Sequence, residues 1–198
     1  MKRVSPHLSR LAAALLVASL VACETPVPAP QFPDITFGHM PPIRLDVADV
    51  EFVAEYAPPQ APPNVEHLFP VRPAAAVKRW AEERIEPAGV MRRAKVTLVN
   101  AAVIEVPLDK KSGLAGVFWN EQSERYDGIV EVRVEIVDDR GFTVGRVRAV
   151  AQRSQTVPED VTLNEREQVW YKLTEALMKD LDAELENSIR KYLQEYVR

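Results

Sequence analysis

Residues 129–153 constrain the fold more than any other stretch of the sequence. Apolar and charged residues alternate from Ile129 to Val137, so a strand formed there has one apolar face and one charged face. The turn sequence Asp138-Asp139-Arg140-Gly141 follows, and the chain returns from Phe142 to Arg153. This pattern predicts an antiparallel hairpin, bulged at Gly145, in a sheet that is covered on one side only.

The last segment predicts one long amphipathic helix. Thr162 and Glu165 form a capping box, and no Pro or Gly interrupts the run from there to Arg198. Its leucines recur mostly every four residues, so the apolar stripe rotates around a helix of 3.6 residues per turn. Two interpretations stay open for the rotated end, at Ile189 and Leu193. Either the helix curves over the sheet, or these side chains contact a ligand or partner.

The other elements are shorter. Residues 43–56 predict a strand with a bulge near Ala48-Asp49, residues 73–86 a helix, and residues 94–108 a further strand. The expected class is therefore α+β. It combines an antiparallel sheet of about four strands with one short helix and one long C-terminal amphipathic helix.

The first 22 residues are typical of an export signal. Lys2, Arg3 and Arg10 are followed by an apolar run, Leu11 to Ala22, that only Ser19 interrupts. This run is too short to cross a bilayer core as a helix, which takes about 20 residues. We therefore expect residues 1–22 to be removed.

The end of this run, Leu20-Val21-Ala22-Cys23, resembles the processing box of bacterial lipoproteins. The resemblance implies cleavage before Cys23 and acylation of its sulfur and its new amino group. Glu24 follows, where Asp marks inner-membrane retention in enteric bacteria, which favours the periplasmic face of the outer membrane. The inner membrane is the alternative location, and a plain secretory signal with a chance cysteine is the alternative interpretation.

Prolines divide the exported chain. Eleven of the 16 lie between Pro26 and Pro70. Because proline fixes φ and has no N–H donor, the stretch from Glu24 to Pro42 is expected to be extended. The sequence thus predicts a lipidated Cys and tether over residues 23–42 and a single periplasmic domain over residues 43–198.

Charge and motifs argue against several function classes. A formal net charge of −4 does not fit a nucleic-acid binder, and one cysteine with three histidines leaves no Cys-rich zinc site. Motifs for nucleotide binding, zinc proteases and serine hydrolases are missing. We therefore expect no catalytic residue, no metal and no cofactor, so the chain is interpreted as not being an enzyme. A hydrolase whose residues form no recognised motif is the alternative.

One apolar stretch, residues 113–119, lies between two predicted strands. If it is exposed, it contacts a membrane, a lipid or a partner; if it folds beneath the long helix, it is core. Both interpretations stay open. The candidate contact residues in it are Leu114, Val117, Phe118 and Trp119.

The order of elements behind the lipidation signal resembles the ABC-type transport auxiliary lipoproteins. The shared features are the lipoprotein signal, a strand before a helix that contains Trp80, the charged hairpin and the closing amphipathic helix. The resemblance implies a non-catalytic accessory binding subunit in envelope lipid or outer-membrane component transport, with a periplasmic or membrane protein partner and a lipid ligand. Small lipoproteins of lipopolysaccharide export are similar. The alternative function is a structural or regulatory adaptor for cell-wall or envelope assembly.

Overall fold

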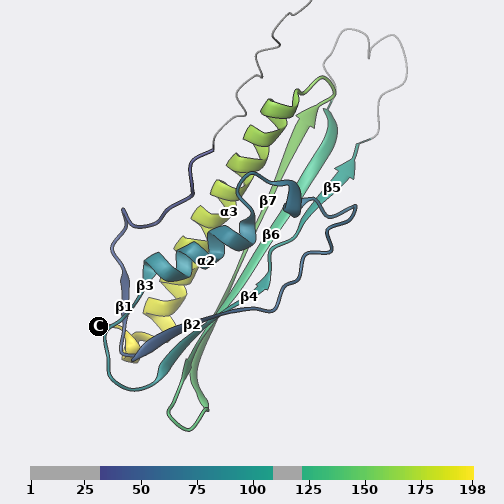
Figure 1. The fold of residues 1–198 in the computed structure, drawn as a ribbon. Helices are drawn as coiled ribbons and strands as arrows, with labels where there is room; N and C mark the ends of the chain where they lie inside the picture. Colours follow the sequence, from purple (N-terminus) through teal and green to yellow (C-terminus); the bar gives the residue numbers. More distant parts are fainter. Residues whose placement is uncertain (1–31, 109–121) are drawn as a thin grey trace, which may run out of the picture. The chain divides into compact units, whose positions relative to one another are not determined.

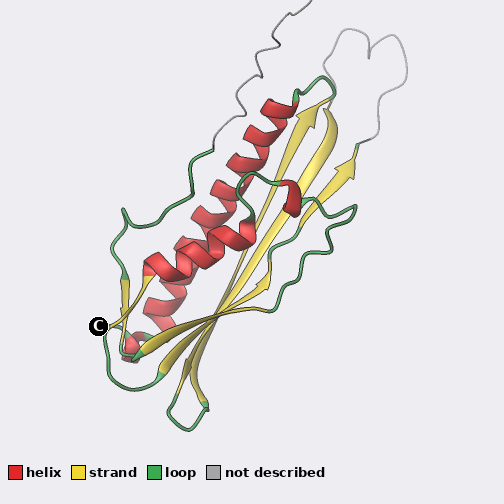
Figure 2. Cartoon of the chain, in the orientation of Figure 1, coloured by secondary structure: helices red, strands yellow, loops and turns green. Residues whose placement is uncertain are grey.

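A computed structural model describes residues 32–108 and 122–198. Two helices pack on one side of a twisted sheet (Figures 1 and 2). The helices are α2 (Pro73–Arg84) and α3 (Leu163–Tyr192), with 3-10 turns at Glu66–Leu68 and Gln194–Tyr196. The strands are β1 (Ile43–Leu45), β2 (Asp49–Ala54), β3 (Ile85–Pro87), β4 (Arg93–Asn100), β5 (Val103–Pro107), β6 (Gln122–Val137) and β7 (Thr143–Pro158).

The predicted hairpin forms the centre of the main sheet. β6 and β7 pair antiparallel over 16 residues each, from Gln122↔Pro158 to Val137↔Thr143. Val144 is the extra residue of a bulge beside Gly145, because Ile136 pairs with Gly145 and Val137 with Thr143. β4 and β5 lie one after the other along the opposite edge of β6, and β2 pairs with β4.

The expectation of a purely antiparallel sheet of about four strands is wrong. The main sheet has five strands and is mixed, since β2 runs parallel to β4, and a second sheet pairs β1 parallel with β3. Helix α2 lies between the members of each parallel pair in the chain. A crossover of this kind returns the chain in its original direction, whereas a short turn reverses it. The α+β class and the two helices are as expected.

Two predicted strands are each divided in the structure. The phase shift near Ala48-Asp49 is the point where the chain leaves the small sheet at β1 and enters the main sheet at β2, and not a bulge. The predicted strand 94–108 breaks at Ala101 and Ala102, where the Asn100 side chain accepts the Ala102 N–H at 3.1 Å. Alternation shifts phase at the first break and continues across the second, and neither pattern by itself shows that the chain passes to a separate strand.

Helix α3 begins as predicted and packs along β6 and β7. The Glu165 N–H donates to Thr162 Oγ1 at 3.3 Å, and the Thr162 N–H donates to the Glu165 carboxylate at 2.9 Å. Gly128 lies so close beneath the helix that a Cβ there would meet the Leu177 methyl at 2.8 Å. The helix therefore rests directly on the sheet backbone at this point.

The rotated end of the apolar stripe is also buried. Ile189 and Leu193 are 0% and 1% exposed, and the Leu193 side chain lies over Gly145. The structure places both residues in the core rather than on an exposed contact face. The physical reason is that the long, twisted β6–β7 pair continues beneath the last turns of α3, so the rotating stripe stays in contact with it.

Candidate functional site

A buried ion cluster joins the two helices. Arg84 on α2 is 1% exposed at its side chain, and its Nε donates to Asp182 on α3 at 2.7 Å. The Trp80 indole N–H donates to the same Asp182 oxygen at 2.7 Å, and a second Arg84 nitrogen lies 2.5 Å from the Glu186 carboxylate. Asp182 and Glu186 belong to a run of helical acidic residues, and such a run usually predicts a solvated helix face. For Asp182 this is wrong, because α2 crosses α3 at this position and covers it.

The same cluster holds the segment before β1 against the helices. Arg84 also donates to the Pro41 carbonyl, and the Glu83 carboxylate accepts the N–H groups of Phe37 at 2.5 Å and Gly38 at 3.0 Å. Asp34 pairs with Arg79 at 2.9 Å. The compact unit thus begins at Phe32, so residues 32–42 of the predicted tether belong to the folded unit.

A hollow of about 500 Å³ lies between this docked segment and α3. Its apolar wall includes Ile35, Phe37 and Met40 from the segment and Met178 from the helix. The α3 side adds two lysines, Lys172 and Lys179, which are exposed and have no ion-pair partner among the described residues. The remaining lining residues are Thr36, His39, Glu175, Ala176 and Asp182.

This combination is suited to binding an amphipathic molecule. Ligand sites in proteins commonly have volumes of about 300–1,000 Å³ and apolar walls with a few polar groups. Ile35 and Met40 are the partly exposed apolar residues of this wall, and the lysine ammonium groups complement an anionic group. Asp182, the buried carboxylate at the hollow, already bonds Arg84 and Trp80 and is not free to act as a base.

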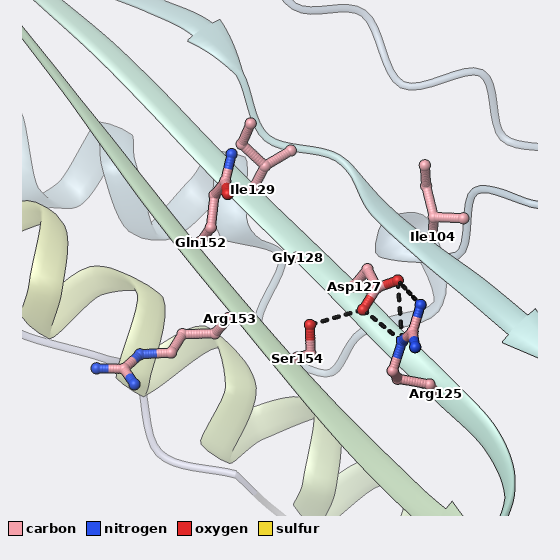
Figure 3. Close-up of a pocket in the computed structure, with 8 residues that line it drawn as sticks. All are labelled: Ile104, Arg125, Asp127, Gly128, Ile129, Gln152, Arg153 and Ser154. Atoms are coloured by element: carbon pink, nitrogen blue, oxygen red, sulfur yellow. Dashed lines mark hydrogen bonds and ion pairs between the residues drawn. The ribbon is translucent and has the colours of Figure 1, made fainter.

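A second, more open hollow of about 830 Å³ lies along β5, β6 and β7 (Figure 3). Asp127 is at its centre and accepts two bonds from Arg125 Nε and Nη2 at 2.8 Å each and one from Ser154 Oγ at 2.6 Å. Ile104, Ile129 and Gln152 complete this surface, while the Arg153 side chain points away towards α3 and pairs with Asp180 at 2.5 Å. The polar groups at its centre thus bond one another.

Asp127 is expected to make the domain more sensitive to acid. The hydrogen bonds from Arg125 hold the pKa of the Asp127 carboxyl below its ordinary value, assisted by Ser154. A depressed folded-state pKa contributes stability above the unfolded value of about 3.9, and that contribution is lost as the pH falls through the folded value. Asp127→Asn should therefore flatten the decline in unfolding free energy between about pH 5 and pH 2.

Urea denaturation at a series of pH values measures this slope. Ser154→Ala keeps the Arg125 pair and is expected to give an intermediate slope. An unchanged slope in Asp127→Asn would show that this pair does not contribute to the acid response.

The charged face of the hairpin is internally neutralised. Arg133 pairs with Glu55 at 2.8 Å and Glu135 at 3.1 Å, Arg146 with Glu135 at 2.6 Å, and Arg148 with Glu131 at 2.6 Å. Each of these arginines thus has a carboxylate partner on the same face. This face is a poorer anion site than the lysines beside α3.

Five of the predicted site residues lie outside the described residues. These are Cys23, Leu114, Val117, Phe118 and Trp119. The docked segment and the Arg84 cluster were missed by the sequence patterns. One signal for the cluster was present, because Trp80 and Arg84 are four residues apart, as are Asp182 and Glu186, and each pair shares a helix face.

Two further observations apply to residues 32–108 and 122–198. No group of three or more His, Cys, Asp or Glu side chains there is arranged to hold a metal ion. No helix in this part of the chain combines the length and apolar character that membrane crossing requires.

Comparisons with known proteins give distant structural likenesses. No family model and no curated protein matches the sequence. A minor lipoprotein from Acinetobacter baumannii is similar at 11% identity and a TM-score of 0.39, over 77% of this chain and 96% of that one. A Xanthomonas campestris protein described with the family model DUF330 is similar at 8% identity and a TM-score of 0.30, over 76% of this chain and 85% of that one.

A PelC dodecamer subunit from Paraburkholderia phytofirmans is similar at 14% identity and a TM-score of 0.20, over 70% of this chain and 94% of that one. At TM-scores below 0.5, none of these likenesses assigns a family or an activity to this chain.

Proposed function

We propose that this chain is a lipid-anchored, non-catalytic accessory binding subunit that takes part in transport of envelope lipid or another outer-membrane component. The observation that carries the proposal is the hollow between the docked segment and α3. Its first lining residue, Ile35, comes twelve residues after Cys23 in the sequence. Even fully extended, that stretch spans only about 40 Å. An acylated Cys23 would therefore keep Ile35 within about 40 Å of its leaflet.

The ligand in this proposal is a phospholipid with a net negative head group. Its acyl chain contacts Ile35 and Met40, the partly exposed apolar residues of the hollow, and its phosphate lies near Lys172 or Lys179. The protein holds the lipid without altering it, on the periplasmic face of the outer membrane, and presents it to a protein partner. The adaptor alternative requires a partner but no lipid.

Filling the hollow tests the proposal. In Ala176→Trp the indole is expected to occupy the space of the acyl chain and to weaken binding of fluorescent phosphatidylglycerol at least about tenfold, or about 1.4 kcal/mol. The measurement is a titration of the purified full-length protein in detergent, after removal of endogenous lipid.

Ala183→Trp is the matched control, since Ala183 is exposed on the same helix but does not line the hollow. It should bind the probe like the wild-type protein. Lys179→Glu should weaken phosphatidylglycerol more than the zwitterionic phosphatidylcholine. Absence of saturable lipid binding by the wild-type protein, together with recovery of a cell-wall protein partner, would favour the adaptor.

A further inference from the structure

Three large apolar side chains are exposed together on two turns. The β3–β4 loop presents Val90, 90% exposed, and Met91, 54% exposed, and the β6–β7 turn presents Phe142, 63% exposed. The Arg92 N–H of the first turn donates to the Asp139 carboxylate of the second at 3.1 Å, so the turns are neighbours. Both lie at the same end of the sheet (Figure 1). We call Val90, Met91 and Phe142 the turn patch.

The turn that carries Phe142 is held rigidly by local hydrogen bonds. The Asp138 carboxylate accepts the N–H groups of Arg140 at 3.0 Å and Phe142 at 2.8 Å, and Gly141 adopts a φ of 86°. The pKa of Asp138 is lowered, chiefly by the Phe142 N–H, so the carboxylate stays charged as the acceptor. The backbone at Phe142 is therefore held in one conformation.

The β3–β4 loop is fixed by its packing. The N–H groups of Ala88 and Gly89 donate to the Leu45 and Val47 carbonyls at 2.8 and 2.9 Å. A Cβ at Gly89 would lie 2.7 Å from the backbone carbon of Asp46, so only glycine allows this approach. Arg92 has a φ of 66° and lies over the Tyr196 ring at 5.4 Å. Because the backbone of both turns is already ordered, binding through these exposed apolar side chains costs little conformational entropy. Exposed apolar patches of this kind are typical of contact sites.

We infer that the turn patch inserts into an apolar recess of a protein partner, and this inference rests on the proposed anchoring through Cys23. Phe32, where the folded unit begins, stacks on Tyr171 at 5.4 Å. The patch lies beyond the other end of α3, beside Tyr196. With a rise of about 1.5 Å per residue, Tyr171 is about 33 Å along the helix from Leu193.

The length of the preceding chain sets which surface the patch meets. The nine residue steps from Cys23 to Phe32 span at most about 30 Å. The turn patch therefore reaches the leaflet of Cys23 only if the domain lies along the membrane or if that stretch runs at full extension back along the domain. A protein partner meets the patch without restricting the domain in either way.

The charged side chain beside the turn patch, Arg140, indicates which polar group the partner presents around its apolar recess. Arg140 is 79% exposed at its side chain and lies over the Phe142 ring at 5.5 Å. Among the described residues its carboxylate partner is Asp138, which leaves other guanidinium N–H groups for a bound protein. The partner is thus expected to place a carboxylate at the rim of an apolar pocket that receives Phe142.

Site-specific photocrosslinking in the native cell envelope tests this inference. The photoreactive amino acid p-benzoylphenylalanine replaces Val90 or Phe142 in the full-length protein, and Leu163 is the control. Leu163 is 69% exposed at the first turn of α3, outside the patch. We expect the same protein to be crosslinked from both patch positions and not from Leu163.

Titration with that purified partner then measures the contact. Met91→Ser with Phe142→Ser should weaken binding at least tenfold, and Leu163→Ser should leave it unchanged. Arg140→Glu should also weaken binding, and Arg140→Lys should recover part of it. Because these side chains are exposed in the free protein, the thermal unfolding midpoint should stay the same in every variant.

Crosslinks to lipid, to a second copy of this chain, to different proteins at Val90 and Phe142, or to nothing would each overturn the inference. Fractionation of the same cells separates this outcome from failure of the anchor. A failed anchor releases the wild-type chain from the membrane fraction. If only the turn-patch inference is wrong, the chain stays in the membrane fraction and no single protein is crosslinked from both Val90 and Phe142.

Discussion

Asp182→Ala is expected to lower the free energy of unfolding by about 3–5 kcal/mol, the usual cost of removing one partner from a buried ion pair. Asp182 is 5% exposed and accepts hydrogen bonds from Arg84 and Trp80, both fully buried. Without it, the Arg84 cation keeps only the Glu186 carboxylate and the Pro41 carbonyl as partners. Urea denaturation followed by far-ultraviolet circular dichroism measures the loss.

Asp180→Ala on the same helix is the matched control. Asp180 also pairs with an arginine, Arg153, at 2.5 Å, but the two side chains are 35% and 53% exposed. An exposed pair of this kind contributes at most about 1 kcal/mol. Equal losses in Asp182→Ala and Asp180→Ala would contradict the interpretation that burial sets the strength of the cluster.

The Arg84 cluster also links stability to the candidate site. Arg84 holds the Pro41 carbonyl, and Pro41 ends the segment that forms one wall of the hollow. Loss of Asp182 is therefore expected to loosen this wall and to weaken lipid binding, even where the sheet remains folded. The mutation thus affects both the fold and the proposed ligand site.

Cys23→Ser is expected to abolish membrane anchoring. The interpretation of Leu20-Val21-Ala22-Cys23 as a lipoprotein processing box requires the cysteine sulfur for acylation. Stable attachment takes two or more acyl chains, because each buried CH2 contributes only about 0.8 kcal/mol and one chain binds marginally. The variant should accumulate as uncleaved precursor and incorporate no labelled palmitate.

Glu24→Gln is the control for this change, because it alters the neighbouring residue and keeps Cys23. It should be cleaved, acylated and recovered with membranes. Electrophoretic mobility, palmitate labelling and fractionation distinguish the two variants. Normal processing and membrane retention of Cys23→Ser would overturn the anchor and, with it, the proposed function.

Much of the central fold could be predicted from local patterns. The alternation around Val130 and Val132, the turn at Gly141 and the capping box at Thr162 each depend on neighbouring residues. The hairpin and long helix that they predict are present. Strand direction at β2 and the division of residues 94–108 were not predictable in this way. Both depend on which distant strand supplies the hydrogen bonds.

The candidate site was less predictable than the fold. The proline-rich composition of residues 23–42 is typical of a tether, yet Phe37 in this stretch is 5% exposed and helps to form the hollow. Phe37 has no helical or strand period around it. Its burial depends on the Glu83 and Arg84 contacts, which come from residues more than 40 positions later.

The sequence by itself determined the one-sided hairpin and the two helices, because each of these depends on residues close together in the chain. The export and lipidation signal at Cys23 is a prediction from the same kind of local pattern. The tertiary structure alone decided the parallel pairing of β2 with β4, the burial of Asp182, the hollow beside α3 and the meeting of the two turns that carry Val90 and Phe142. Each of those depends on packing between segments tens of residues apart. Such packing is selected by the total burial and hydrogen bonding of the folded chain, and no local period records it.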